Sequence, residues 1–547
     1  MKFRTRKLAL LSLLLVLVCS VVSVTAFAAD GEEYVSNMYA TFWGLVPPLI
    51  AIVLALITKE VYSSLFIGII AGALFYSNFN PIGALDTIVS DGLIASLVEP
   101  WNGGIMLFLV LLGIIVALMN KAGGSAAFGR WAEKNVRTRS GAMFATFALG
   151  ILIFIDDYFN CLTVGSVMRP LTDAHKISRA KLAYLIDATA APVCMIAPIS
   201  SWACAVASAV EGTAVDGQIS GFNLFVQAIP YNFYSILTFV FIIGLIIMKM
   251  DYGPMRIHEM NAMLNGDLYT TEGRPYASID ADTPSKNGRV IDLVLPIALL
   301  IILSVVGLLY TGGMFDGSGT GFFAAFENCD ASVGLPWAAL ISLILSIVYF
   351  MCRRVISFKD AMKCLPQGFI AMVPAILILT FALTLKNITG LLGAAEYVRV
   401  VMESSAAGLS FFLPAVIFLV ACGLAFSTGT SWGTFSILVP IVVAIFPFGS
   451  ELLTISISAC LAGAVCGDHC SPISDTTIMS STGAQCDHVN HVSTQLPYAI
   501  TVAGVSFVCY IISGFVQNIW ICLPLGIALM IATLFVIKAV LSKKYAK

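Results

Sequence analysis

Residues 154–160 read FIDDYFN, so two adjacent carboxylates and an amide stand between apolar sequence and the segment CLTVGSVMRP of 161–170. Charged groups and non-helical backbone are tolerated within a membrane only where protein or water satisfies them. The stretch therefore predicts a functional interior of a membrane protein and not a helix that faces lipid.

The composition of the whole chain supports a membrane protein. Of its 547 residues, 59% are hydrophobic and only 11% are charged, whereas a soluble protein of this length needs far more polar surface. Apolar stretches of roughly 20 residues, the length that crosses a bilayer as a helix, recur from end to end. We predict an all-α polytopic membrane protein of about 11–12 transmembrane helices.

Several function classes find no support in the sequence. The net charge of −2 gives no indication of a nucleic-acid partner. The chain has no G-x-x-x-x-G-K-[ST] motif of nucleotide-binding loops and no H-E-x-x-H protease motif. We therefore expect neither an ATP-driven pump nor an enzyme, and no cofactor.

The distribution of basic residues predicts the orientation. Residues 1–28 combine a basic start with an apolar core, which fits either a signal peptide or a first transmembrane helix. Lys and Arg are absent from the connecting segments predicted at 78–103, 211–231, 311–334 and 484–497. Because positive residues stay on the cytoplasmic side, we expect a multi-pass protein of the cell membrane with a cytoplasmic loop at 251–290 and a cytoplasmic C-terminus.

Two apolar segments do not cross the membrane in this topology. Residues 141–170 begin and end on the cytoplasmic side, and residues 408–447 begin and end on the outer side. Each is predicted to be a re-entrant hairpin, and each precedes a span interrupted by proline, at 182–210 and 452–480. The order of hairpin and broken span is the same in both, but the charge-derived orientation is opposite.

The two halves, 29–250 and 291–547, are therefore predicted to form an inverted-topology repeat. Residues 187–201 and 461–475 align and share Pro-Ile-Ser. Broken helices that meet near the middle of the membrane indicate the binding site of a secondary transporter.

Polar side chains gather in these four segments: Asp156, Asp157 and Asn160; Asp187; Ser427, Thr428 and Thr430; and Asp468, Ser474, Asp475, Thr476 and Thr477. A charged carboxylate within a bilayer is costly unless it is paired or hydrated. None of these acids has a basic residue nearby in its own membrane segment, so we expect the missing cation to be the transported ion. Sodium prefers hard oxygen ligands, and a desolvated carboxylate can hold a proton or a sodium ion in turn.

Structural alternatives exist for some of these residues. Asp156 or Asp157 could cap the returning half-helix, and Asp187 could bond to a neighbouring span. A soft-metal site such as zinc is a further alternative for Cys466, His469, Cys470, Cys486, His488 and His491, although their spacing is not that of a standard zinc finger. His488 and His491 could instead lie at the membrane face as groups that titrate near neutral pH.

Residues 467–484, GDHCSPISDTTIMSSTGA, closely resemble the signature of the NhaC-type Na+/H+ antiporters. The stretches FIDDYFNCLTVGSVMRPLTD and AYLIDATAAPVCMIAPISSW look like the matching first-half motifs. The resemblance implies the ion-transporter superfamily, with paired hairpins, two discontinuous helices, and exchange of internal sodium for external protons. By motif match it implies ion-site roles for Asp468, Ser474, Asp475, Thr476 and Thr477, and for Asp156, Asp157 and Asn160.

The resemblance leaves a second function open, because some relatives exchange organic acids and couple malate uptake to lactate release. An organic anion needs a cationic or helix-N-terminal partner. Arg169 is the only arginine near a hairpin and is expected at the cytoplasmic face, which favours cations alone. The expected partners are Na+, H+ and the lipid bilayer, with Asp468 and Asp475 as ligands of the transported Na+. A homodimer is implied only by the frequency of dimers in the superfamily, and a channel or sensor is the alternative from a different class.

Overall fold

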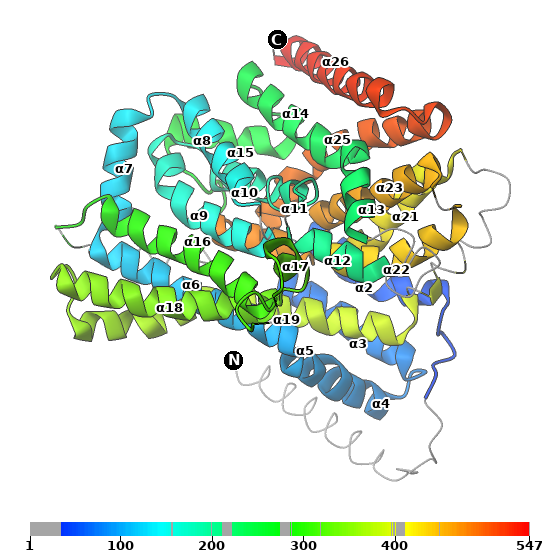
Figure 1. Cartoon of the computed structure of the whole chain (residues 1–547), viewed down its shortest axis with the longest axis horizontal. Helices are drawn as coiled ribbons and strands as arrows, with labels where there is room; N and C mark the ends of the chain where they lie inside the picture. Colours follow the sequence, from blue (N-terminus) through cyan, green and yellow to red (C-terminus); the bar gives the residue numbers. More distant parts are fainter. Residues whose placement is uncertain are drawn as a thin grey trace, which may run out of the picture. The chain divides into compact units, whose positions relative to one another are not determined.

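The computed structural model describes residues 34–545 except 59, 155–156, 199, 211–220, 274–284, 286, 318, 395, 398–399, 401–410 and 448. The chain divides into two units, 1–36 and 37–547, and the following account concerns the second unit. All regular elements among the described residues are helices (Figure 1). The all-α fold class is therefore confirmed.

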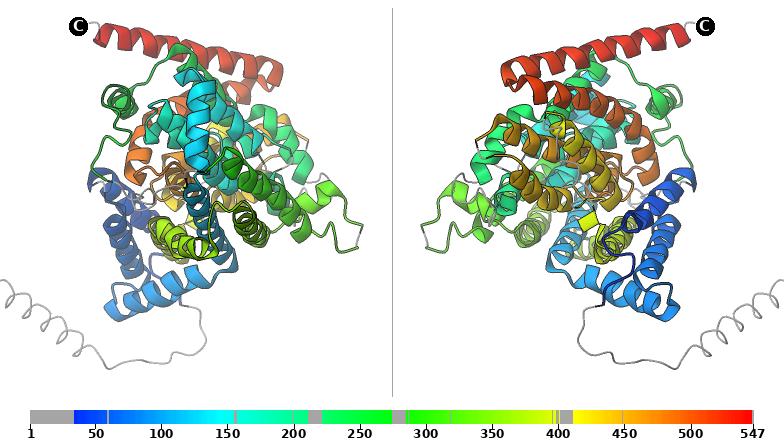
Figure 2. Two further views of the ribbon diagram at one scale, coloured as in Figure 1. Left: turned by 90° about the vertical axis from the view of Figure 1, so that its left-hand side faces the viewer. Right: turned by 90° about the vertical axis from the view of Figure 1, so that its right-hand side faces the viewer.

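One group of helices packs around α6. Its members are α2 (Val46–Thr58), α3 (Val61–Tyr76), α6 (Pro100–Ala122), α16 (Ile291–Thr311), α18 (Ala331–Cys352) and α19 (Phe358–Leu391). Helix α6 contacts α18 and α19, α16 lies along α18, and α3 lies along α19 and α2 (Figure 2). The backbones of α6 and α19 approach closely, because a Cβ on Gly368 would lie 2.4 Å from the backbone of Ile114. Such small residues at crossings are typical of packed membrane helices.

A second group contains the segments predicted as hairpins and broken spans. Its helices are α8 (Arg139–Leu152), α9 (Asp157–Ala174), α10 (Arg179–Asp187), α11 (Ala191–Cys194), α12 (Ser201–Val210), α21 (Leu413–Thr428), α22 (Ser431–Ile445), α23 (Glu451–Cys470) and α24 (Asp475–Ala484). Helices α21 and α22 are separated only by 429–430, and α23 and α24 by 471–474. The interruptions lie within the four segments singled out by sequence.

In each predicted hairpin, α8–α9 and α21–α22, the second helix packs against a helix from the other half of the chain. Helix α9 packs on α24, whereas α22 packs on α12. The α9–α24 crossing is made by backbone, because a Cβ on Gly165 would lie 2.4 Å from the carbonyl carbon of Gly483. The α12–α22 crossing is aromatic, with ring centroids of Trp202 and Trp432 5.5 Å apart. This exchange is what an inverted repeat would produce, but the repeat and the domain limits stay predictions.

The remaining elements connect or flank these groups. They are η1 (Phe42–Leu45), α4 (Pro81–Asp86), η2 (Thr87–Ile94), α5 (Ala95–Val98), α7 (Gly124–Asn135), α13 (Gly221–Ala228), η3 (Ile229–Tyr231), α14 (Phe233–Met248), α15 (Gly253–Asn265), α17 (Phe322–Glu327), α25 (His488–Val516) and α26 (Ile519–Tyr545). Helix α25 packs against α10, α14 and α23, and α26 packs along α14.

Seven of the described helices are long and apolar enough to cross a membrane, or up to nine if each of two bent pairs is one span. Five shorter apolar helices, among them much of α2 and α3, add to these. The polytopic class is thus supported, whereas the exact count of crossings stays a prediction. The predicted first span within 1–28 lies outside the described residues.

Three segments predicted as connections are helical. Residues Pro81–Val98, within the predicted loop 78–103, form an apolar helical stretch of membrane-crossing length. The segment 484–497 contains the start of α25, whose first turns are buried. The polar segment 251–290 contains α15, which buries Met255 and Glu259. The charge pattern missed these helices because it reports on the ends of spans and not on backbone conformation.

Candidate functional site

The break between α23 and α24 positions the densest group of predicted residues. Ser474 is the N-cap of α24, and its hydroxyl accepts a hydrogen bond from the Thr477 amide at 3.2 Å. Asp475 follows in the first turn, where a carboxylate is favoured by the helix dipole. The α21–α22 turn packs against this break at Gly429, which has φ +66° and whose added Cβ would lie 2.4 Å from the Ile473 carbonyl oxygen.

Asp468 is the most enclosed carboxylate of the break, with no exposed surface. The Thr476 hydroxyl donates to its Oδ2 at 2.9 Å, and the hydroxyls of Ser474 and Thr476 lie 3.2 Å apart. Its Oδ1 is buried and accepts no hydrogen bond from the residues that the structure describes. Asp468 therefore keeps an acceptor oxygen for a further ligand.

Asp475 lies at the edge of this group and is only partly buried. The Tyr158 hydroxyl of α9 donates to its Oδ2 at 2.7 Å, and the Thr476 amide donates to its Oδ1 at 2.8 Å. Asp475 and Tyr158 also line a cavity of about 30 Å³ next to Trp101 of α6, which is room for a water molecule or an ion. Asp475 thus connects the enclosed group to space between the two helix groups.

Asp187 ends α10 and is fully buried. It accepts hydrogen bonds from Gln495 at 2.5 Å, from His491 at 3.2 Å, and from the hydroxyls of Thr477 and Ser480 at 3.2 Å each. All four donors belong to α24 and α25. This is the contact with neighbouring helices that the structural alternative for Asp187 predicts.

Groups of α24 bond to each of the three carboxylates, and those that reach Asp468 and Asp187 are hydroxyls. Thr476 bonds to Asp468, while the Thr477 hydroxyl donates to Asp187 and lies 3.4 Å from the Asp468 carbonyl oxygen. The structure thus brings together Asp187, Asp468, Ser474, Asp475, Thr476 and Thr477. Carboxylate, hydroxyl and carbonyl oxygens are the hard ligands that alkali and alkaline-earth cations prefer.

The first-hairpin residues take a different place. Asn160 is buried and donates through Nδ2 to the carbonyl oxygens of Gly150 and Ile153, at 2.7 Å each, and of Thr189 at 3.3 Å. It therefore joins the end of α8 to the break after α10. Asp157 is buried as the first residue of α9, and Asp156 lies outside the described residues.

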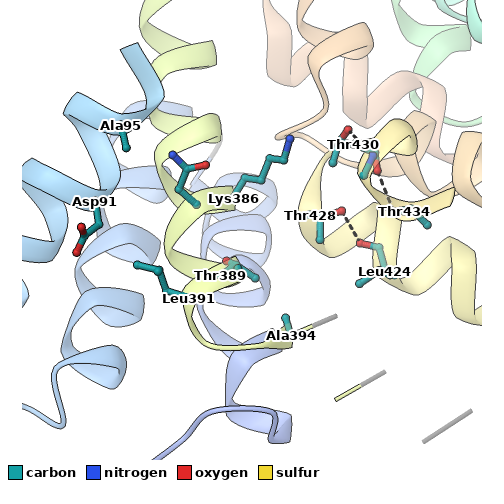
Figure 3. Close-up of a pocket in the computed structure, with 13 residues that line it drawn as sticks. Asp91, Ala95, Lys386, Thr389, Leu391, Ala394, Leu424, Thr428, Thr430 and Thr434 are labelled. Atoms are coloured by element: carbon teal, nitrogen blue, oxygen red, sulfur yellow. Dashed lines mark hydrogen bonds between the residues drawn. The ribbon is translucent and has the colours of Figure 1, made fainter. Parts of the chain in front are cut away.

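The second-hairpin residues do not turn toward the carboxylates. The hydroxyls of Ser427 and Thr428 both donate to the Leu424 carbonyl oxygen at 2.9 Å, and Thr430 caps α22. Thr428 and Thr430 line a separate cavity of about 560 Å³ that also contains Lys386 of α19 (Figure 3). Their turn meets the α23–α24 break through its backbone, where the Asp475 amide donates to the Gly429 carbonyl oxygen at 3.4 Å.

The zinc alternative finds no support in the described part of the chain, where no three His, Cys, Asp or Glu side chains are grouped to hold a metal ion. The side chains of His488 and His491, for which a position at the membrane face was the alternative, are buried within the protein, with exposed fractions of 6% and 0%. Helix α25 begins at His488 and packs against α24 and α10. His488 bonds to the Pro472 carbonyl oxygen at 2.7 Å.

Sequence reasoning missed four residues of these sites: Tyr158, Ser480, Gln495 and Lys386. Helical spacing could have found two of them, because Ser480 follows Thr476 by four positions and Gln495 follows His491 by four. A lone lysine in an apolar helix is also a recognisable functional signal. Tyr158 stands inside the FIDDYFN stretch, but nothing in the sequence pairs it with Asp475.

Membrane-crossing helices with broken segments around buried oxygen ligands are typical of secondary transporters, and this is the class of protein that the fold and site define. The chain belongs to the Na+/H+ antiporter family, whose model matches residues 193–515. It is therefore a membrane transporter of the antiporter type, as the resemblance in sequence implied.

Two of the three relatives that follow are named as antiporters. The chain is 38% identical over 494 residues to an uncharacterized protein of Haemophilus influenzae, covering 88% of this chain and 92% of that one. It is 27% identical over 200 residues to the malate-2H+/Na+-lactate antiporter of Bacillus subtilis, covering 36% and 40%. It is 34% identical over 114 residues to the arginine/ornithine antiporter ArcD of Halobacterium salinarum, covering 20% and 23%.

Proposed function

We propose that this protein exchanges cytoplasmic Na+ for external H+ by alternating access, with Asp468 and Asp475 binding the two ions in turn. The observation that carries the proposal is the Oδ1 atom of Asp468, which is buried without a hydrogen bond from any described residue. A buried carboxylate oxygen of this kind is costly unless a proton or a cation occupies it.

The surroundings of Asp468 suit Na+. Hydroxyls of Ser474 and Thr476 lie on one side, and within the described residues no Lys or Arg forms an ion pair with Asp468 or Asp475. The positive charge of Lys386 is attracted to Asp475, but the two side chains are too far apart to form an ion pair. A cation from solution is therefore the natural counter-charge for these acids.

The three carboxylates take different roles in this proposal. Asp468 is the principal ligand. Asp475, at the cavity beside α6, passes ions between that ligand and the space between the helix groups. Asp187 has four hydrogen-bond donors of its own, so it positions α24 and α25 and contributes charge to the site.

Reconstituted protein tests the proposal. An imposed pH gradient should drive Na+ uptake into proteoliposomes without any organic solute, and Asp468→Asn and Asp475→Asn should each reduce this uptake at least about tenfold. Asp360→Asn, an acid outside the site at the start of α19, is the matched control and should transport normally. Normal uptake by both site variants, with all proteins folded by size-exclusion chromatography, would refute these roles.

Exchange of a small organic anion is a second candidate, favoured by the cavity of about 560 Å³ at the α21–α22 turn. The Lys386 side chain extends toward Thr430 there (Figure 3), and its Cε lies 4.0 Å from the position of a Cβ built on Gly433. The ammonium group and the N-terminus of α22 are both positive, and Lys386 has no ion-pair partner among the described residues. A carboxylate would satisfy both.

Lys386 in this cavity is a cationic partner that the sequence argument, which considered only the arginine Arg169, left out. Arg169 itself is buried in α9. The Bacillus subtilis relative is a malate-2H+/Na+-lactate antiporter, which supports the second candidate. Na+ flux that requires malate or lactate, and that Lys386→Met abolishes while Lys359→Met does not, would establish it over simple cation exchange. Passive Na+ flux without exchange would instead indicate a channel.

A further inference from the structure

A cavity of about 660 Å³ lies where α14 and α26 end side by side (Figure 1). Helix α15 covers it and packs on α10 and α25. Charge patterning independently predicts that 249–289 and the C-terminus lie on the cytoplasmic side, and both segments contribute to this one cavity. The residues that line this cavity do not include Asp187, Asp468 or Asp475, so the cavity takes no part in the proposed exchange.

Three basic side chains line this cavity: Lys249, Arg256 and Lys538. The side chains of Lys249 and Lys538 form no hydrogen bond or ion pair with any residue in the described ranges. Lys249 is the C-cap of α14, so part of its charge offsets the negative end of that helix. Lys538 lies in the last turns of α26 and adds a further positive charge to the cavity.

The two acids at the cavity are already bound by other groups. Asp251 accepts from the Lys181 ammonium at 2.6 Å and from the Tyr498 hydroxyl at 2.6 Å. Glu259 accepts from the Ser178 amide at 2.8 Å and pairs with Arg139. The acids therefore do not neutralise the lysines, and the cavity keeps a net positive charge.

The rest of the cavity is apolar and continues onto exposed apolar surface. Met260 and Leu541 line it. Ile257 and Leu264 on the outer side of α15 are 63% and 74% exposed, and Val540 of α26 is 58% exposed. In a protein of this class such side chains lie against lipid. A positive pocket thus opens beside an apolar surface at the ends of two membrane-crossing helices.

We propose that this cavity binds the headgroup of an anionic phospholipid. The phosphate would lie among Lys249, Arg256 and Lys538, and the acyl chains would follow the apolar side chains of α15 and α26. Basic pockets between transmembrane helices on the cytoplasmic side select anionic headgroups in this way. The Lys181–Asp251 ion pair joins the cavity wall to α10, which ends in Asp187, so bound lipid should also stabilise the fold.

Lipid binding to the purified full-length protein tests this proposal by native mass spectrometry. Phosphatidylglycerol should bind at least about tenfold more tightly than phosphatidylcholine with the same acyl chains. The double variant Lys249→Gln/Lys538→Gln should weaken phosphatidylglycerol binding roughly 30-fold. The control Lys359→Gln, which removes an exposed lysine on α19, should bind as wild type does.

Glycerol 3-phosphate separates a lipid from a soluble phosphate, because it offers the same headgroup chemistry without acyl chains. Weak competition by glycerol 3-phosphate supports a lipid site, and competition equal to that of the lipid would overturn it. Equal binding of the two lipids, or unchanged binding in the double variant, would also overturn the proposal. None of these results depends on which ions or solutes the protein exchanges.

Discussion

The contact between α9 and α24 offers a sharp test of how the site is assembled, by the substitution Gly165→Ala. A Cβ on Gly165 would lie 2.4 Å from the carbonyl carbon of Gly483 and 2.6 Å from its Cα and oxygen. Ordinary contacts begin at 3.4 Å, so the two helices must separate by about 1 Å (3.4 − 2.4). The contacts are with backbone, which cannot move aside as a flexible side chain would.

This separation should affect both stability and transport. Overpacking of this kind costs about 1–3 kcal/mol, which should lower the apparent unfolding temperature in detergent by a few degrees. The crossing also holds Tyr158 against Asp475. A displacement of about 1 Å can lower a position-sensitive rate by about 100-fold, and we expect exchange in proteoliposomes to fall at least tenfold.

Gly504→Ala is the matched control, because a Cβ there meets nothing within 4 Å and alanine favours a helix. Its unfolding temperature should equal or exceed that of the wild type, and its transport should be unchanged. The reasoning fails if Gly165→Ala unfolds and transports like Gly504→Ala, since the close crossing would then carry no constraint.

Three further predictions concern other parts of the fold. Asn160→Ala leaves three buried carbonyl oxygens without their donor and should cost about 1–3 kcal/mol, visible as earlier thermal unfolding, which Asn160→Asp should not restore. Trp202→Ala opens a cavity at the α12–α22 crossing and should cost about 3–5 kcal/mol, whereas Trp202→Phe should cost less; equal losses would contradict the packing argument. Burial raises the pKa of Glu259 above its usual 4.5, with Asp251 adding to the rise and Arg139 opposing it. The folded state then holds this proton more tightly than the unfolded state, so stability should fall as pH rises from 4.5 through the folded-state pKa. Glu259→Gln should flatten that part of the curve of unfolding temperature against pH. An unchanged slope in this variant would contradict the role given to Glu259.

Local features of the sequence predicted the interruptions of the helices well. Pro472 has no amide hydrogen to continue α23, Ser474 caps the next helix, and Gly429 is needed for a turn with positive φ. These signals act over a few neighbouring residues, so they can be recognised in the sequence alone. The same local logic placed Asp468 and Asp475 in one group.

Contacts between distant segments were not predictable in the same way. Tyr158 and Asp475 are 317 positions apart, and Asp187 and Gln495 are 308 apart. A single sequence does not show which residues of two distant helices will be in contact after folding. For the same reason nothing in the sequence indicates that Lys386 faces the N-terminus of α22. Charge patterning alone predicts a loop where α15 forms.

The aromatic α12–α22 crossing has a consequence for how many ions one chain can hold. Hydrogen-bonded oxygen atoms of Asp475 and Asp468 lie beside the α9–α24 crossing, whereas the rings of Trp202, Trp432 and Phe435 pack together at the α12–α22 crossing. Rings supply no hard ligands. The predicted inverted repeat would therefore be asymmetric in function, with oxygen ligands for a cation beside one helix crossing and aromatic packing at the other.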